Sequence, residues 1–521
     1  MNTCGRRQFL KLTTAAAVGS GCSTQTHRAA STLSRSSSGP PNILVFLTDD
    51  HGQWAQPAYG NSEILAPHLD RLAARGVRMK RAYTPCPVCS PARASFFTGR
   101  MPSQHGIHDW IEETQHAWSH PGLRGQTLIS ELLKGAGYYT GLIGKWHCGR
   151  TREPQPGFDR WFSYWVNQYP HRGTQNFSDQ GMHVVEEGAQ SPLLTDRAIE
   201  FLRHHHDHRD RGDQPFFLFV SYVDTHNPHN QAPPELVSMY ADATFRHIPD
   251  ERLPACHGKA LTPAGATFEA DRNRHADYYA AVSSIDRELG RVLAELESLG
   301  RLDDTLIVYT ADHGYNAGHH GIWEKGNGTL PQNFFDESIR VPCTISWPAA
   351  GVRQNVTCDD AVSHCDLWAT LLDAAHATPT GKTAAKINSP GKSYFRRLRG
   401  ERADGAWNTE ICDYGNARMI SDGRHKLIRR YPFGGVRFSD ELYDLRDDPR
   451  ETTNRIAERA FSGITTSLDQ QMTRFFERHT ISGHSGLDLE HQPECTPASP
   501  WILAAQEQAH PATQPATRRV G

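Results

Sequence analysis

Three segments of the chain are apolar at almost every position over the length of one β-strand. They are residues 42–48 (NILVFLT), 216–222 (FFLFVSY) and 305–310 (TLIVYT). A strand with one face in water alternates apolar and polar residues, whereas a continuous apolar run fits a strand that is buried on both faces. We therefore predict a parallel or mixed sheet that is covered by helices on both sides.

A helical pattern fills the interval before the third strand. Apolar residues recur there in steps of three and four, and Gly300 follows the last of them: Tyr278, Val282, Ile285, Leu289, Val292, Leu296 and Leu299. This stripe predicts a helix that packs on the sheet and ends near Gly300. Shorter amphipathic patterns occur at residues 67–74 and 126–135. Strands and helices thus alternate along the chain, which is typical of the α/β fold class.

The hydrophobic pattern changes after residue 376. Short strand-like runs and then a helical pattern follow, at residues 407–413, 417–421, 425–429 and 464–478. We predict a smaller α+β domain with an antiparallel sheet over residues 377–482, after an N-terminal domain over residues 41–376. Residues 483–521 are rich in Pro, Ala, Gln and His and lack periodicity, so an irregular tail is expected.

Residues 1–40 have the character of a targeting segment and linker. Arg6 and Arg7 precede a mildly apolar stretch from Leu12 to Gly21. This pattern resembles a bacterial twin-arginine signal, which predicts export to the periplasm or the cell exterior. Cys22 raises the possibility of a lipoprotein anchor. No apolar run reaches the length of about eighteen residues that a transmembrane helix needs, so none is expected.

Acidic residues follow two of the predicted strands. Asp49 and Asp50 come directly after the first strand, and Asp312 and His313 come after the third. Ligands bind at the carboxyl ends of the strands in α/β sheets. Two adjacent carboxylates repel each other unless a cation lies between them, and their oxygens suit a hard cation such as Ca²⁺ or Mg²⁺. The alternative is a pair of solvated turn aspartates.

Basic and imidazole groups follow other strand-like runs. Lys145 and His147 end the segment 137–147 (GYYTGLIGKWH), His226 follows the second strand, and Lys325 lies in a Gly- and Trp-containing loop. A lysine in such a position can neutralise an anionic substrate oxygen, and a histidine can transfer a proton. A surface lysine is the alternative interpretation of Lys325.

The segment at residues 87–100 (PVCSPARASFFTGR) places a proline two residues and an arginine four residues after Cys89. Cys86 and Cys89 also have the spacing of a redox dithiol or of half a zinc site. A second pair for zinc is missing, and the chain is too long for a small redox domain. A buried structural cysteine is the remaining alternative. Together with the strand-end groups, this segment predicts a site that hydrolyses an anionic ester.

The net charge of the chain limits the classes of molecule that it is expected to bind. A net charge of −3 over 521 residues argues against a nucleic-acid-binding protein, which would carry a basic face. The eleven cysteines show no spacing from which disulfide pairs could be read.

With these residues the chain resembles the sulfatase family, within the alkaline-phosphatase-like superfamily. The resemblance covers roughly residues 41–458. It rests on the segments 87–99 and 137–147, on Asp49–Asp50, on Asp312-His313-Gly314 with Lys325, and on residues 442–445 (LYDL). It implies a large mixed, mostly parallel sheet sandwiched by helices, with a smaller C-terminal domain.

The resemblance also implies a cofactor and a modification. A maturation enzyme would oxidise Cys89 to formylglycine, and one Ca²⁺ per chain would be bound by Asp49, Asp50, Asp312, His313 and the modified Cys89. Many relatives have Asn at the position of His313. A hydrated formylglycine would attack the sulfur of the substrate, held by Arg93, and its second hydroxyl would then expel the sulfate.

The remaining roles are implied in the same way. Lys145, Lys325 and His226 would contact the sulfate. His226 or Lys325 would protonate the leaving oxygen, and His147 would be the base. His229 lies close to His226 in the sequence and competes for its role.

The sequence thus predicts an exported sulfatase that acts on a sulfated carbohydrate or polysaccharide. Two other functions compete with it. One is a phosphonate monoester or phosphodiester hydrolase of the same superfamily. The other is a relative that binds a sulfated ligand without the modification and without catalysis.

Overall fold

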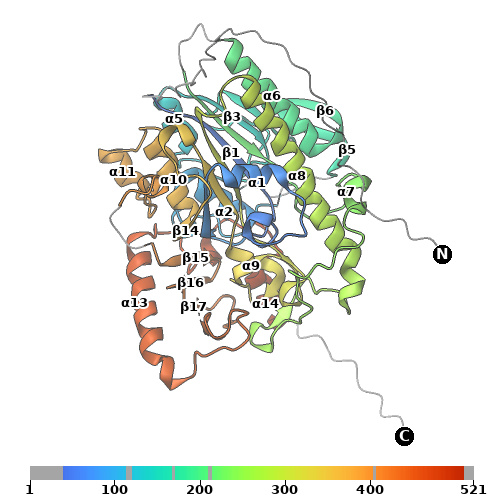
Figure 1. Ribbon diagram of the computed structural model, residues 1–521. Coiled ribbons are helices and arrows are strands. Elements are labelled where there is room, and N and C mark those ends of the chain that lie inside the picture. The colour runs from blue at the N-terminus through green and yellow to red at the C-terminus, as the bar shows by residue number, and fades with distance from the viewer. Residues whose placement is uncertain (1–38, 113–119, 167–169, 209–213, 403–406, 510–521) are drawn as a thin grey trace, which may run out of the picture. The chain divides into compact units, whose positions relative to one another are not determined.

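The computed structural model describes residues 39–112, 120–166, 170–208, 214–402 and 407–509. The predicted targeting segment, apart from its last two residues, lies outside this part of the chain. The largest element is a ten-stranded sheet in the order β14-β2-β13-β9-β1-β7-β3-β4-β5-β6 (Figure 1). Its centre is formed by the three apolar runs, as β1 (Asn42–Thr48), β7 (Phe216–Ser221) and β9 (Thr305–Ala311).

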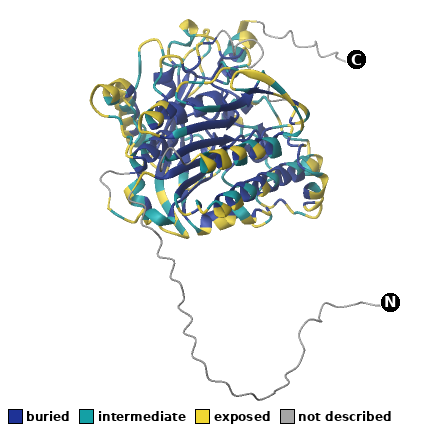
Figure 2. Cartoon of the chain, turned by 90° about the horizontal axis from the view of Figure 1, so that it is seen from above, coloured by how far each residue is buried: buried dark blue, intermediate teal, exposed yellow. Residues whose placement is uncertain are grey.

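Strand β1 lies between β7 and β9 and is parallel to both. Every residue of β1 is buried, and its side chains alternate between two separate apolar cores. Ile43, Val45 and Leu47 face one core, while Leu44 and Phe46 face the other. The central strands are accordingly dark blue along their length in Figure 2. The predicted doubly covered sheet is confirmed.

The sheet is mixed rather than wholly parallel. Four further strands are parallel to the three central strands: β2 (Val77–Tyr83), β14 (Val356–Ser363), β3 (Tyr139–Gly144) and β4 (Arg160–Tyr164). Two strands are antiparallel to both of their neighbours. β13 (Cys343–Ser346) lies between β9 and β2, and β5 (Arg172–Asp179) lies between β4 and β6 (Met182–Ala189). The carboxyl ends of β1, β2, β3, β7, β9 and β14 therefore share one edge.

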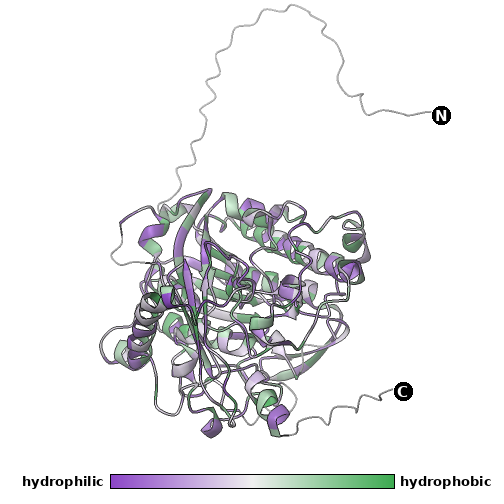
Figure 3. Ribbon diagram, turned by 90° about the horizontal axis from the view of Figure 1, so that it is seen from below, coloured by the Kyte–Doolittle hydropathy of each residue, from purple (hydrophilic) through white to green (hydrophobic). Residues whose placement is uncertain are grey.

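Helices cover each face of this sheet. The predicted long helix is α8 (Arg272–Ser298), which buries Tyr278, Val282 and Leu289 in the same core as Leu44, beside α6 (Gln190–Asp207) and α1 (Pro67–Ala74). The other core lies under α2 (Cys89–Thr98), α5 (Ile129–Gly135) and α10 (His364–Ala374). The helices carry hydrophilic and hydrophobic residues side by side in Figure 3, as expected of helices with one packed face.

The C-terminal part forms a second, antiparallel sheet of four strands in sequence order. The strands are β15 (Glu410–Tyr414), β16 (Ala417–Ser421), β17 (His425–Arg430) and β18 (Glu441–Asp444). One face packs on α13 (Ser462–Arg478) through Leu427 and Met472. The other face, with Cys412 and Met419, packs against Cys86 and Val88 from the segment before α2. The predicted α/β fold with a smaller antiparallel sheet is confirmed.

Buried ion pairs join the two sheets. Glu410 of β15 is fully buried and receives both terminal nitrogens of Arg340, each at 2.9 Å. Arg81 of β2 adds a contact of 2.6 Å to the same carboxylate. The buried Lys426 of β17 donates to Asp336 and Glu451 at 2.7 and 2.8 Å. The described residues accordingly belong to one compact unit, and the domain boundary near residue 376 stays a prediction.

The end of the chain is less irregular than the sequence predicts. Residues Pro500–Ala509 form the helix α14, and Trp501 packs edge-on against Tyr414 with ring centroids 5.6 Å apart. This helix depends on a tertiary contact, which explains why no periodicity indicates it. The nine cysteines of the described residues are all free thiols, and Cys343 is buried in a strand as predicted. No helix of this part of the chain is long and apolar enough to cross a bilayer.

Removal of the Glu410 charge tests the link between the sheets. Glu410→Gln leaves Arg340 without a buried carboxylate, so the free energy of unfolding should fall by about 3 kcal/mol in urea titrations. Asp359→Asn on the neighbouring strand β14 is the control, because Asp359 pairs with Lys80 at 3.4 Å and both side chains are exposed. An equal loss in both variants would contradict a specific role for the buried pairs.

Candidate active site

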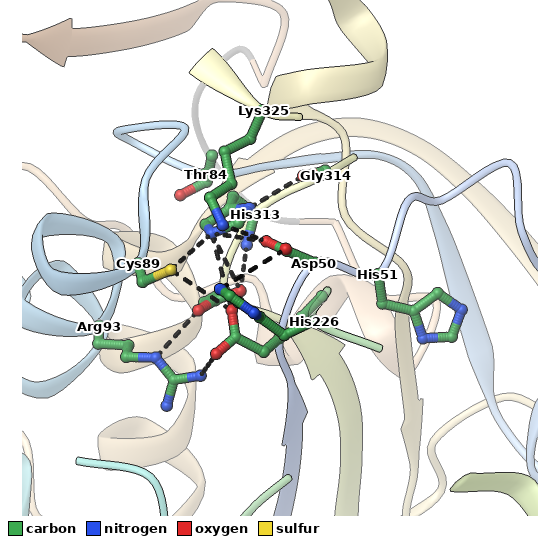
Figure 4. A network of polar contacts seen from close by, with 12 residues as sticks. Asp50, His51, Thr84, Cys89, Arg93, His226, His313, Gly314 and Lys325 are labelled. Carbon is green, nitrogen blue, oxygen red and sulfur yellow. Dashed lines mark hydrogen bonds and ion pairs between the residues drawn. The ribbon is translucent and has the colours of Figure 1, made fainter. Parts of the chain in front are cut away.

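The predicted acidic residues meet at the carboxyl edge of the large sheet. Asp49 and Asp50 follow β1, and Asp312 follows the adjacent strand β9. All three carboxylates are fully buried. Asp50 lies together with Cys89, Arg93, His313 and Lys325 in Figure 4, and Asp49 and Asp312 both pair with Arg93. The chain thus concentrates negative charge where water cannot solvate it, and that arrangement requires nearby positive charge.

The backbone of Asp50 adopts the left-handed conformation, with φ of 55°. This conformation is uncommon for a residue with a side chain. The Tyr278 hydroxyl of α8 donates to the Asp50 carbonyl at 2.8 Å and accepts from the Gly52 N–H at 3.1 Å. The Thr225 hydroxyl lies 2.9 Å from the same Asp50 carbonyl. These contacts hold the turn that aims the two carboxylates at one point.

Cys89 is the first residue of α2 and is 2 % exposed. Its Sγ lies 3.4 Å from Asp49 Oδ1 and 3.3 Å from His313 Nε2. Burial, and then the Asp49 charge, raise the pKa of the Cys89 thiol well above its usual range. In the absence of a bound cation this shift favours the protonated thiol, which is a poor nucleophile.

Arg93 lies one turn further along α2 and is completely buried. Its guanidinium donates to Asp312 Oδ2 at 2.9 Å, to the Lys145 carbonyl at 2.9 Å, to Ser221 Oγ at 2.7 Å and to Asp49 Oδ2 at 3.3 Å. The guanidinium therefore links the ends of β1, β3, β7 and β9. Such a planar donor with several partners fixes geometry better than a lysine would.

Two lysines complete the charge balance. Lys145, after β3, donates to Asp49, and Lys325 Nζ donates to Asp50 Oδ1 at 2.7 Å. Gly144 precedes Lys145 with φ of 110°, and a Cβ there would lie 2.0 Å from the Ser221 carbonyl. Only glycine lets β3 approach β7 this closely. The prediction that Lys325 points into a site rather than to the surface agrees with its 4 % exposure.

The two aspartates respond differently to this environment. Burial raises the pKa of Asp49, but the charges of Lys145 and Arg93 outweigh it and hold that pKa well below the usual value. Burial raises the pKa of Asp50 well above the usual value, because Lys325 offsets only part of the effect. Among the residues that the structure describes, Asp50 Oδ2 also has no hydrogen-bond partner. Asp50 is therefore the carboxylate that gains most from an added cation.

His313 presents a lone pair to the same point. Its Nδ1 lies 2.9 Å from the Gly314 carbonyl, which can only accept, so the proton is on Nδ1. Burial lowers the pKa of the imidazole, which favours the neutral ring. Its Nε2 lies 3.5 Å from both Asp50 Oδ1 and Asp312 Oδ1. A neutral imidazole in this tautomer can ligate a metal ion.

Four of the five predicted ligands form one compact cluster. The ligand atoms of Asp49, Asp50, Cys89 and His313 all lie within 4.8 Å of one another. Asp312 borders the cluster through His313, while its Oδ2 binds Arg93. The convergent oxygens, the unpartnered Asp50 Oδ2 and the oriented imidazole fit a divalent cation.

The histidines take different positions. His147 Nε2 lies 3.0 Å from the Ile111 carbonyl, so Nδ1 carries the lone pair of the neutral ring; burial and the charge of Lys145 lower its pKa. His226 Nε2 lies 3.9 Å from Asp50 Oδ2. His229 points elsewhere, with its ring nitrogens at the Thr225 carbonyl and the Tyr315 hydroxyl. The geometry favours His226 over His229 as the site residue.

Comparison with known proteins identifies the family. A family model described as Sulfatase matches residues 41–377, which is more than half of the chain. The chain belongs to the sulfatase family. A second model, described as N-sulphoglucosamine sulphohydrolase, C-terminal, matches residues 318–478. This sulfatase is a sulfuric ester hydrolase, and family membership implies a formylglycine and a metal ion.

Curated relatives are similar over most of their length. An N-acetylglucosamine-6-O-sulfatase of Bacteroides thetaiotaomicron is 27% identical over 491 residues, covering 80% of this chain and 82% of the relative. Human arylsulfatase A is 27% identical over 493 residues, covering 83% and 86%. The two family models, rather than these coverages, place the match on both sheets, at residues 41–377 and 318–478.

Solved structures share the fold. One, in complex with its substrate D-glucosamine-2-N,6-O-disulfate, has a TM-score of 0.70 at 24% identity and covers 84% of this chain and 98% of its own. A phosphonate monoester hydrolase of Agrobacterium radiobacter has a TM-score of 0.67 at 20% identity, covering 84% and 96%. At these identities the likeness establishes the fold alone.

Sequence reasoning missed the residues that position the predicted ones. Tyr278 appears in the sequence only as one member of the apolar stripe of α8, and Ser221 only as part of a buried strand. Both use a hydroxyl group, toward Asp50 and Arg93 respectively. The only indication of these positioning roles in the sequence was that a tyrosine and a serine occur within runs that are otherwise apolar.

The Tyr278 hydroxyl can be tested through metal binding. Tyr278→Phe removes the donor to the Asp50 carbonyl and should weaken binding of a divalent cation, with Ca²⁺ as the probe, about tenfold in calorimetric titrations, because partners behind metal ligands contribute to that extent. Tyr309→Phe is the control, since its buried hydroxyl lies 2.9 Å from His51 Nδ1. Equal affinities in the two variants would show that Tyr278 does not position Asp50.

Proposed function

We propose that this sulfatase hydrolyses a sulfate ester on a carbohydrate or polysaccharide, with Cys89 converted to formylglycine and one Ca²⁺ held by the strand-end carboxylates. The observation that carries the proposal is the packing of Cys89 at the start of α2, in contact with Asp49 and His313. The named carbohydrate sulfatase among the relatives supports the substrate class.

Asp49, Asp50, Asp312 and His313 would hold the cation together with residue 89. Their oxygens and the imidazole nitrogen suit Ca²⁺, which accepts mainly oxygen ligands in flexible geometry. When bound, the cation would supply Lewis-acid stabilisation of negative charge, and a hydrated formylglycine at residue 89 would supply the nucleophilic hydroxyl. Formation of the formylglycine would require a separate maturation enzyme.

The cationic side chains would bind the transferring sulfate. Lys145 and Lys325 donate to Asp49 and Asp50, the two carboxylates that a divalent cation would ligate. A cation at these carboxylates would compete with the ammonium groups for negative charge, and the ammonium groups would then have positive charge to offer to a substrate anion. Arg93 is already held at four points, so its role is to fix residue 89 and the adjacent carboxylates.

Proton transfer would use the two site histidines. His147 is neutral and carries its lone pair on Nδ1, which suits a general base. His226, or alternatively Lys325, would donate a proton to the leaving oxygen. Lys325 competes for this role because its Nζ lies within 2.7 Å of Asp50 Oδ1.

We also propose export by the twin-arginine route. The support is the pattern of Arg6 and Arg7 before residues 12–21. This route carries folded proteins, so modification of Cys89 would precede export. Attachment of lipid at Cys22 would be an addition to this route.

Mass spectrometry of the peptide that contains residue 89 tests the modification. In active enzyme the peptide should be lighter than the encoded one, because sulfur and two hydrogens are replaced by one oxygen. Cys89→Ala should lower turnover of an aryl sulfate about a thousandfold or more, since it removes the nucleophile. Cys148→Ala, which changes a neighbouring buried thiol, is the control. Full activity with an unmodified thiol would contradict the mechanism.

A comparison of sulfate esters with phosphonate esters as substrates tests the reaction class. Sulfate monoesters and phosphonate monoesters both present one negative charge, so the charged site alone does not separate them. We expect kcat/KM for an aryl sulfate to exceed that for the matching aryl phosphonate monoester by about tenfold or more. The reverse ratio would favour the phosphonate hydrolase, and no turnover of either ester would favour a binding protein.

A further inference from the structure

A cavity of about 380 Å³ lies between α13 and the edge of the large sheet, and none of the proposed catalytic or metal-binding residues lines it. From α13 it receives Arg474, Phe475 and Arg478. Lys392 and Trp407 line it from the segment that precedes β15. The neighbouring position of α13 and β15 can be followed in Figure 1.

Basic side chains outnumber acidic ones among the described residues that line this cavity. Arg474 and Arg478 are four residues apart on one face of α13 and are exposed, as is Lys392. Within the described ranges none of the three forms a short-range ion pair, although the charge of Lys392 acts on the Asp366 carboxyl. The one acidic lining residue is Asp366, whose carboxylate already accepts from the backbone N–H groups of Ser363 and Lys392, each at 2.8 Å. Three like charges around a cavity favour an anionic ligand.

Aromatic side chains lie next to these cations. The Lys392 ammonium is 5.9 Å from the centre of the Trp407 ring, and Phe475 is half-buried. Trp407 is 8% exposed, and its indole N–H has no hydrogen-bond partner among the residues that the structure describes. A ring with one apolar face and polar substituents matches this combination of aromatic and donor groups.

The cavity shares the sheet edge that carries the active site. Tyr83 and Ser363, the last residues of β2 and β14, line it. β2 is three strand positions from β1, which corresponds to about 14 Å at the usual spacing of strands. A saccharide of a few rings spans such a distance.

We propose that this cavity is a second saccharide site, which binds a sulfated sugar residue of the substrate chain away from the ester that is cleaved. The proposal rests on the proposed action on sulfated carbohydrates. Arg474 and Arg478 pair with the sulfate group, since guanidinium groups form strong charge-assisted hydrogen bonds with such oxyanions. Trp407 and Phe475 pack against the sugar ring.

Binding of a heparin-derived hexasaccharide tests the site by calorimetry. The double variant Arg474→Gln/Arg478→Gln should bind about tenfold more weakly than the unchanged chain, because two exposed charge contacts are lost. The control is Lys382→Gln/Arg459→Gln, which removes the same net charge at exposed positions outside the cavity. Any binding at the active site is common to both variants, so their difference reports the cavity alone.

The control should change affinity by less than about twofold. Equal affinities in the two double variants would overturn the proposal, as would a failure of the unchanged chain to bind the hexasaccharide. Turnover of an aryl sulfate, measured in parallel, should be unaffected by Arg474→Gln/Arg478→Gln. If affinity falls as expected but no sulfate ester is hydrolysed, the proposed function fails while the second site stands. If esters are hydrolysed but affinity is unchanged, only the second site fails.

Discussion

The rest of the structure depends on one constraint: the buried carboxylates at the carboxyl edge of the large sheet must be neutralised by buried cationic side chains. Asp49, Asp312, Arg93 and Lys145 have no exposed side-chain surface, and Lys325 with its partner Asp50 is almost as enclosed. An ion in such a place is costly unless its partners are positioned closely. The ends of β1, β3, β7 and β9, together with the first turns of α2, are therefore held in one fixed arrangement.

The composition of this cluster suits the binding of anions. Three carboxylates face three cationic side chains, so the protein groups are close to neutral when all six are charged. A divalent cation at the carboxylates would leave the set with net positive charge. A sulfate ester would then find a site that is dry and preorganised, where electrostatic stabilisation of developing charge is strongest. Binding of the cation and binding of the substrate would be coupled for that reason.

The fold and the residues of the candidate site could be predicted from the sequence wherever a short segment carries the signal by itself. Apolar runs such as residues 42–48 identify buried strands, and charged groups directly after them fall on the active edge because parallel strands end together. Contacts between distant segments could not be predicted. Tyr278 reaches Asp50 from a helix more than two hundred residues later, and the helix of Trp501 depends on Tyr414. Neither contact leaves a periodic pattern.

The small sheet belongs to the scaffold of the active site rather than to an accessory module. The segment that leads into α2 is held by β15, whose Asp413 N–H donates to the Pro85 carbonyl at 2.8 Å and whose Cys412 Sγ lies 3.1 Å from the Thr84 carbonyl. The loop of Lys325 closes on the same segment, since the Gly326 N–H donates to the Pro87 carbonyl at 3.1 Å. The position of residue 89 thus depends on strands more than three hundred residues away. The boundary predicted near residue 376 therefore lies between two parts of the chain that both contribute to the position of residue 89.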